Sequence, residues 1–349
     1  MLTERRAKLL SLIISEYVDT ATPVGSDAVV RKHRLGFSSA TIRNEMARLE
    51  EEGFISHPHT SAGRVPSDKG YRYYVEALMQ ERDLSWDAKQ MIRHQFHQAG
   101  REEDEWIHLA AAVLARAVEN AAFVTLPRSP EARIKRLEMV SIQDNAALIV
   151  IVLQQARLKQ QVLIFPEPIE QEQLTAISNH LNQAFSGLSA HEIARSQVQL
   201  TQLEWHVANA VREIMDASDA AGYDDAYLEG VRNVMAKPEF ATSEKMLNLL
   251  DVLEQRNLPK LIPFRELSKD GVTVMIGAEH EEDAMRDYSL VVAPYGAPGG
   301  VQGAMAVLGP TRMHYSETIS TVRFMAGVMS EMLRTFYGED EPDDAEPSG

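Results

Sequence analysis

The sequence predicts a multidomain α+β protein whose N-terminal part is a small helical domain with a β-hairpin. Two observations predict this class. Helical hydrophobic spacing, capping residues and turns alternate over residues 1–82, and short strands separated by turn signals alternate with helical stretches beyond residue 120. A chain of 349 residues is also long enough for two or three domains.

The first domain opens with an amphipathic helix over residues 3–17, which a Pro- and Gly-containing segment at 22–26 interrupts. A short second helix spans residues 26–34. A third helix, over residues 38–52, begins at a serine cap and ends at Gly53, because glycine adopts the left-handed conformation of a helix end without steric strain. The two helices and the turn between them are the elements of a helix-turn-helix.

A β-hairpin follows over residues 54–66, because short extended runs flank a polar, Gly-containing turn. Ser67 then caps a fourth helix over residues 68–79. Three helices, a hairpin and a helix in this order predict a winged helix-turn-helix over residues 1–82. A generic helical domain with a solvated polar face remains the alternative that the pattern alone allows.

The third helix has an apolar face and, opposite it, a face of polar and charged side chains. Ile42, Met46 and Leu49 form its buried stripe, whereas the opposite side presents the amide of Asn44 and the guanidinium of Arg48. Such groups suit a major groove, where Asn pairs with adenine and Arg with guanine or phosphate. Three glutamates at the C-terminal end of the helix place the reading end in its N-terminal half.

The remainder of the chain predicts antiparallel sheets flanked by helices. Strands are expected over residues 121–126, 133–142, 146–153, 160–165, 260–264, 272–277, 289–294 and 301–308. Helices are expected over residues 101–122, 170–186, 199–216, 222–236, 243–255 and 316–336. A meander followed by helices is a self-contained two-layer unit, and the strands outside it are similar to the GAF fold.

These elements suggest a domain order. A linker over residues 83–100 joins the winged helix to a GAF-like domain made of residues 101–127 and 239–338, into which residues 128–238 are inserted as an αβ domain. The insertion could instead lie nearer residues 190–258. The last residues, 339–349, form a Pro-rich acidic tail that is expected to be disordered.

The formal charge of −16 argues against nucleic-acid binding, but it is an average over parts of the chain that differ in charge. Residues 1–82 hold 12 basic and 11 acidic side chains, whereas the other 267 residues hold 23 basic and 40 acidic ones. The acidity therefore belongs to the rest of the chain and not to the first domain. We expect weak non-specific binding and dependence on a specific, paired DNA site.

Other classes of protein are disfavoured. The absence of cysteine excludes disulfides and thiolate zinc sites, and no apolar stretch is long enough to span a membrane, so a cytoplasmic protein without a metal or cofactor is expected. The glycines at 296–303 fit a turn better than a nucleotide loop. The C-terminal methionines fit core filling better than an adaptable partner groove. A ligand of the GAF-like domain stays unknown.

Two long strings carry a family resemblance. SSATIRNEMARLEEEG and PHTSAGRVPSDKGYR in the first domain closely resemble the HrcA family of bacterial heat-inducible transcription repressors. DYSLVVAPYG and GAMAVLGPTRMHY look like later motifs of the same family. The resemblance implies a homodimer that binds double-stranded DNA at an inverted-repeat operator of chaperone operons, with the chaperonin as co-modulator, and an inserted dimerisation domain.

The resemblance also implies which residues contact DNA, although no individual base contact follows from it. The expected contacts of the recognition helix are Ser39, Thr41, Arg43, Asn44 and Arg48, and those of the wing are His57, His59, Thr60 and Arg64. Metal binding by His57 and His59 is disfavoured because no cysteine or carboxylate pair lies nearby.

The alternative function is a small-molecule-metabolising or sensing α/β protein with an accessory winged helix. An enzyme should show a nucleophile-base pair, paired carboxylates or metal-ligand spacing, and the sequence shows none of these patterns. A repressor without catalytic activity is therefore the preferred reading.

Overall fold

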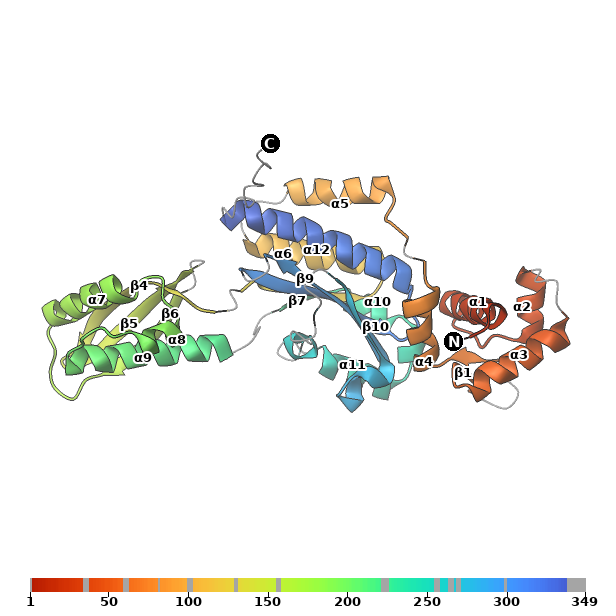
Figure 1. Ribbon diagram of the computed structural model, residues 1–349, viewed down its shortest axis with the longest axis horizontal. Coiled ribbons are helices and arrows are strands. Elements are labelled where there is room, and N and C mark those ends of the chain that lie inside the picture. Colours follow the sequence, from red (N-terminus) through yellow and green to blue (C-terminus); the bar gives the residue numbers. More distant parts are fainter. Residues whose placement is uncertain are drawn as a thin grey trace, which may run out of the picture. The chain divides into compact units, whose positions relative to one another are not determined.

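The computed structural model describes residues 2–33, 38–58, 63–80, 82–98, 103–128, 131–154, 158–220, 226–253, 258–262, 267, 271–297 and 300–337. Helices and antiparallel strands make up this part of the chain, which confirms an α+β protein. It folds as two compact units (Figure 1), one made of residues 1–127, 225–296 and 303–334 and the other chiefly of residues 128–224. The predicted acidic tail lies outside the described residues.

The first unit begins with helices and a short strand pair. Helices α1 (Glu4–Thr20), α2 (Ser26–His33) and α3 (Ser39–Glu51) are followed by strands β1 (Ile55–Ser56) and β2 (Val65–Pro66), helix α4 (Asp68–Tyr73) and a π-helical turn η1 (Tyr74–Leu78). The strands β1 and β2 pair antiparallel. The helix that the sequence predicts over residues 68–79 is thus α-helical only in its first half.

Side-chain caps and a shared apolar core explain this local order. The hydroxyls of Ser38 and Ser67 each accept a hydrogen bond at 3.1 Å from the backbone N–H three residues further on, at the starts of α3 and α4. Leu10 of α1 and Met46 of α3 are completely buried between the helices. The period of apolar residues therefore specifies which faces of these helices meet.

The rest of the first unit is built on a five-stranded sheet in the order β7-β3-β10-β9-β8. Its strands are β3 (Ala121–Thr125), β7 (Ala226–Glu229), β8 (Thr273–Ile276), β9 (Tyr288–Gly296) and β10 (Gln302–Pro310). Helices α6 (Glu103–Val118) and α12 (Tyr315–Tyr337) lie on one face and α11 (Ser243–Val252) on the other (Figure 1). Covered on both faces, the central strands are almost continuously buried.

Two predicted elements in this unit are wrong. Residues 222–236 do not form one helix, because strand β7 pairs with β3 and only then does the short helix α10 (Val231–Met235) begin. The strand expected at 260–264 begins instead within a 3₁₀ turn, η4 (Leu258–Leu261), and its later residues lie outside the described chain. Pairing with a distant strand overrides the local pattern in β7.

Shorter helices complete the first unit. Helix α5 (Trp86–Gln98) occupies most of the expected linker at 83–100. The 3₁₀ turns are η3 (Pro238–Phe240), η5 (Gly277–Glu279) and η6 (Asp283–Met285). No helix in the described residues is long and apolar enough to cross a membrane.

The second unit is an antiparallel meander covered by helices on one face. Its strands are β4 (Ile134–Gln143), β5 (Ala146–Leu153) and β6 (Leu158–Ile164), and its helices are α7 (Gln171–Phe185), α8 (Ala190–Arg195) and α9 (Gln202–Ala220). Alternate side chains of β5, such as Ile149 and Ile151, enter the core beneath the helices. The intervening residues lie on the other face of the sheet.

Candidate nucleic-acid interface

Helix α3 has a buried face and an exposed face on opposite sides. Met46 and Leu49 are fully buried, whereas the side chains of Arg43, Asn44 and Arg48 are exposed. Within the residues that the structure describes, these three side chains form no hydrogen bond or ion pair. Their donors and acceptors are therefore open to another molecule.

The two predicted hydroxyl contacts lie at the start of α3 and already have partners. The hydroxyl of Ser39 donates to the carboxylate of Asp27 in α2. The hydroxyl of Thr41 lies 2.9 Å from that of Ser38, which caps the helix. Both predicted residues therefore anchor the beginning of α3 while remaining partly exposed.

A buried carboxylate fixes α3 against α1. The side chain of Glu45 is only 8% exposed, and it accepts hydrogen bonds from Arg5 and, at 3.0 Å, from Nε of Arg6. Arg6 also donates through Nη1 to Glu52 at 2.6 Å. Burial raises the pKa of Glu45, but the hydrogen bonds and charges of both arginines outweigh it, so the pKa lies below its ordinary value. Helix α3 is thus held by charge as well as by apolar packing.

A second glutamate of α3 binds the β1–β2 hairpin. Glu50 accepts from Nδ1 of His57 at 2.5 Å and from Nε and Nη2 of Arg64 at 3.2 and 3.1 Å. Burial raises the pKa of Glu50, but the hydrogen bonds from His57 and Arg64 and the charge of Arg64 lower it further than burial raises it. The other predicted wing residues, His59 and Thr60, lie outside the described residues. One carboxylate therefore connects α3 to the residues that follow β1 and precede β2.

The sequence did not single out these carboxylates. It identified Glu50 only as a group that repels phosphate, and it gave no role to Arg5, Arg6 or Glu45. The partners are 39 and 40 residues apart for Glu45, so no local spacing signals the pairing. Only the packing of α1 across α3 brings them together.

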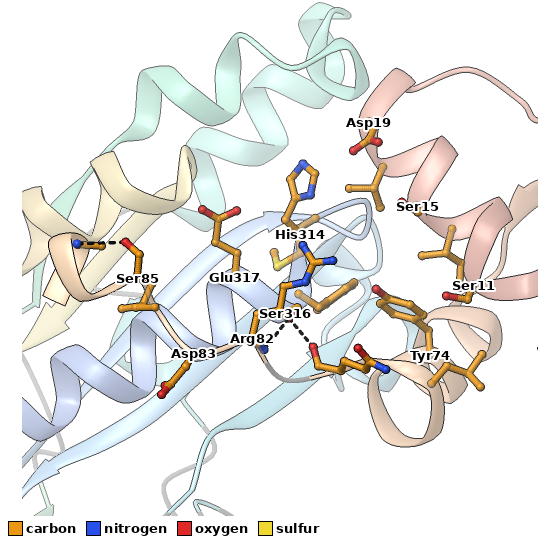
Figure 2. A pocket seen from close by; sticks show the side chains of 18 residues that line it. Ser11, Ser15, Asp19, Tyr74, Arg82, Asp83, Ser85, His314, Ser316 and Glu317 are labelled. Carbon is orange, nitrogen blue, oxygen red and sulfur yellow. Dashed lines mark hydrogen bonds between the residues drawn. The ribbon is translucent and has the colours of Figure 1, made fainter. Parts of the chain in front are cut away.

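A cavity of about 820 Å³ adjoins α1, the segment after η1 and the start of α12 (Figure 2). Its ionisable lining residues are Tyr74, Arg82, Asp83, Asp19, His314, Tyr315 and Glu317. Asp83 pairs with Lys89 at 3.0 Å. No cluster of His, Asp and Glu suited to a metal ion exists in the described residues. The cavity therefore offers no metal centre.

Comparison with known proteins gives one consistent result. Residues 104–319 match the family described as HrcA protein C terminal domain. The chain is 44% identical to the heat-inducible transcription repressor HrcA of Herpetosiphon aurantiacus over 97% of both chains. It is 42% identical to the protein of the same name from Chloroflexus aurantiacus, over 99% of this chain and 98% of the relative.

A solved structure shares the fold. It is the crystal structure of a hypothetical protein at 2.2 Å resolution, with a TM-score of 0.63 and 22% sequence identity, and the similarity covers 96% of this chain and all of that one.

Proposed function

The chain belongs to the HrcA family of heat-inducible transcription repressors, and from that premise we propose that residues 1–82 form a winged helix that binds an inverted-repeat operator. The relatives are repressors and not enzymes, so the accessory-domain alternative with a metabolic activity is set aside. A repressor acts where the DNA is, which in a bacterium is the cytoplasm. The rest of the described first unit we assign to a GAF-like domain.

The exposed face of α3 carries this proposal. Asn44 and Arg48 project from the side opposite the buried stripe and Arg43 from its flank, and none of them is occupied by another described side chain. An amide and guanidinium groups on one helix face can pair with base edges and phosphates in a major groove. Ser39 and Thr41 would add hydroxyl contacts at the N-terminal end of the same helix.

The wing supplies the second proposed contact region. His57, His59, Thr60 and Arg64 would touch the phosphate backbone or the adjacent minor groove. Because Glu50 binds both His57 and Arg64, their position relative to α3 is set before DNA arrives. The ion pair with Glu50 offsets the positive charge of Arg64. We therefore expect Arg64 to position the wing more than to attract phosphate.

The second unit supports the proposed homodimer. On the uncovered face of its sheet, Val140, Leu148 and Val162 lie side by side in register across three strands. Val140 and Val162 are each 50% exposed, and Ile164 on the same sheet is 67% exposed. An apolar sheet face of this kind is typical of an interface between subunits. We therefore assign dimerisation to the second unit, which makes up most of the inserted domain that the sequence predicts over residues 128–238.

Two symmetric copies would read two half-sites, because one winged helix buries too small an interface for strong selectivity. We propose that the operator lies at chaperone operons and that repression ends on heat shock. The role of the chaperonin as co-modulator rests on the family resemblance. It can be tested by measuring the recovery of active repressor after heating, with and without purified chaperonin.

The test of DNA recognition is a gel-shift titration with the inverted-repeat duplex that the wild-type protein selects from a random library. Arg43→Ala and Asn44→Ala should each weaken binding by about 1–3 kcal/mol. Asn179→Ala and Arg232→Ala remove the same groups from exposed positions on α7 and α10 and should leave affinity unchanged. Equal affinity of all four variants would refute the assignment of α3.

A further inference from the structure

The first domain is fastened to the sheet-bearing part of the same compact unit by a set of specific side-chain bonds. We call residues 2–80 the head, and residues 103–127, 226–296 and 303–334 the body. Both belong to one unit of the chain. The contacts between them lie at helix α4, at the end of α1 and at the segment that follows η1.

The first fastening is an arginine of α4. Arg72 donates to the backbone carbonyl of Val274 in β8 at 2.7 Å and binds the carboxylate of Glu279 through both Nε, at 2.7 Å, and Nη2. The hydrogen bonds to Glu279, together with its charge, outweigh the desolvation of Arg72 and raise the pKa of this guanidinium. A two-point contact of this kind fixes orientation as well as distance.

The second fastening lies one helical turn away. The carboxylate of Asp68, in the first turn of α4, accepts a hydrogen bond from the backbone N–H of Ala278 at 2.9 Å. Gly277 precedes it with a φ of +53°, and a Cβ at this position would overlap the Asp68 carboxylate. The body therefore has a glycine at a point where the Asp68 carboxylate leaves no room for a Cβ.

The third fastening is at the end of α1. Arg312 of the body donates through Nη1 to the carbonyl of Val18 at 2.5 Å, and its Nε and Nη2 are held by Glu239 at 2.5 and 3.2 Å. Helix α1 has no basic residue in its own last turn. Arg312 thus supplies the cation that the C-terminal carbonyls of a helix favour.

Further contacts join the segment after η1, which connects the head to the rest of the chain, to helix α12. Ser316 of α12 donates to the carbonyl of Gln80 at 2.8 Å, and Ser320 to that of Arg82 at 2.6 Å. The rings of Tyr71 and Tyr315, both about 1% exposed, pack with centroids 5.8 Å apart. The connection is therefore bound to α12 and does not act as a free tether.

From these contacts we infer that Arg72, Asp68 and Arg312 are positioning residues that give the repressor its selectivity for the spacing between the two half-sites of its operator. The inference rests on the proposed winged-helix dimer. Heads on free tethers would follow half-sites at many separations, whereas each added base pair moves a half-site by about 3.4 Å and rotates it by about 35°. Heads held to the body at three points have less freedom to follow that rotation than heads on free tethers.

The experiment measures the affinity of the full chain for the library-selected inverted repeat and for duplexes in which its spacer is lengthened by one to five base pairs. The wild-type protein should lose at least about 30-fold in affinity at five added base pairs, where the half-sites face opposite sides of the duplex. Arg72→Gln and Glu279→Gln should lose less than about 5-fold over the same series. Affinity for a single half-site should stay unchanged in both variants.

Charge-matched controls separate positioning from attraction to phosphate. Arg82→Gln removes a positive charge, as Arg72→Gln does, and Glu317→Gln removes a negative charge, as Glu279→Gln does. Both side chains line the cavity beside α1 and α12 (Figure 2), where neither forms a hydrogen bond or ion pair with a described residue. Both should retain the wild-type spacing profile. The charge exchange Arg72→Glu with Glu279→Arg should restore a narrow profile that Arg72→Glu alone has lost.

Three outcomes have defined meanings. Identical spacing profiles in wild type, Arg72→Gln and Glu279→Gln would overturn the inference. Tighter binding of these variants to the original spacing would also overturn it, because the contacts would then inhibit the head instead of positioning it. Failure of the wild-type protein to select any duplex would refute the proposed function itself.

Discussion

Replacing Arg6 by methionine tests whether charge pairing holds helix α3 in place. Methionine keeps an unbranched side chain for packing against α3 but removes the bonds to Glu45 and Glu52. Glu45 is 8% exposed and, among the described residues, retains Arg5 as its one remaining partner, whose own side chain is 49% exposed. In the variant, the buried carboxylate of Glu45 therefore keeps one of its two arginine partners.

The magnitude follows from these exposures. Losing a hydrogen bond to a charged, buried group destabilises a structure by about 1.5–3 kcal/mol, and losing the more exposed pair with Glu52 by about 0–1 kcal/mol. Arg5 takes over part of the pairing with Glu45. We therefore expect Arg6→Met to lower the free energy of opening of α3 by about 1–3 kcal/mol, which is equivalent to about 5- to 150-fold faster amide exchange. Arg5→Met should change the exchange by less than about 1 kcal/mol because Arg5 is half exposed.

The assay is native-state hydrogen exchange with mass spectrometry on peptides that cover residues 39–51, with peptides from residues 171–185 as an internal reference. The pKa of Glu45 is lowered by folding, so its stabilisation is complete above the ordinary pKa of a glutamate and is lost as pH falls through the folded value. Neutral pH therefore reports the full effect. Unchanged exchange in Arg6→Met, or an equal change in Arg5→Met, would refute the reasoning.

Three further predictions concern the same domain. Gly70→Ala places a Cβ against the backbone carbonyl of Phe54 and should destabilise the head by about 1–3 kcal/mol in thermal melts, whereas Gly25→Ala, whose Cβ would meet nothing within 4 Å, should change stability by less than about 0.5 kcal/mol. Because pairing lowers the pKa of Glu50, its hold on His57 and Arg64 is complete at neutral pH and is lost as pH falls through the lowered value. Wild-type protein should therefore become sensitive to proteolysis within residues 57–64 only at acidic pH, below the ordinary pKa of a glutamate. Glu50→Gln should already be sensitive at pH 7, and equal resistance of both proteins at that pH would contradict the assignment. Operator affinity should fall linearly with the logarithm of salt concentration, and Arg48→Gln should reduce that slope by about one if Arg48 contacts a phosphate; a slope equal to that of wild type would exclude the contact.

The sequence predicted those elements whose residues repeat with the period of their own secondary structure. Helix α3 has its predicted buried stripe because Ile42, Met46 and Leu49 recur at helical spacing. The meander β4-β5-β6 also lies where alternation and turns place it. Strand β7 was missed because it is four residues long, lies at the edge of its sheet and owes its conformation to pairing with β3.

Some features of the candidate site could be predicted from the sequence, and others depend on tertiary packing. The exposed groups of α3 could be found because helical geometry alone assigns them to one face. The pairing of Glu45 with Arg5 and Arg6, and that of Glu50 with Arg64, depends on how separate elements pack. Charge counting treated these glutamates as equivalent negative groups, although their burial and partners make them part of the framework of the head.

The carboxylates of α3 also determine how the domain can diversify. Arg43, Asn44 and Arg48 support nothing else among the described residues, so they can change without altering the frame in which α3 is held. Glu45 and Glu50 each bind two side chains from other elements, and a substitution there disturbs α1 or the wing as well. Libraries that randomise positions 43, 44 and 48 while keeping 45 and 50 should therefore yield folded proteins with new operator preferences.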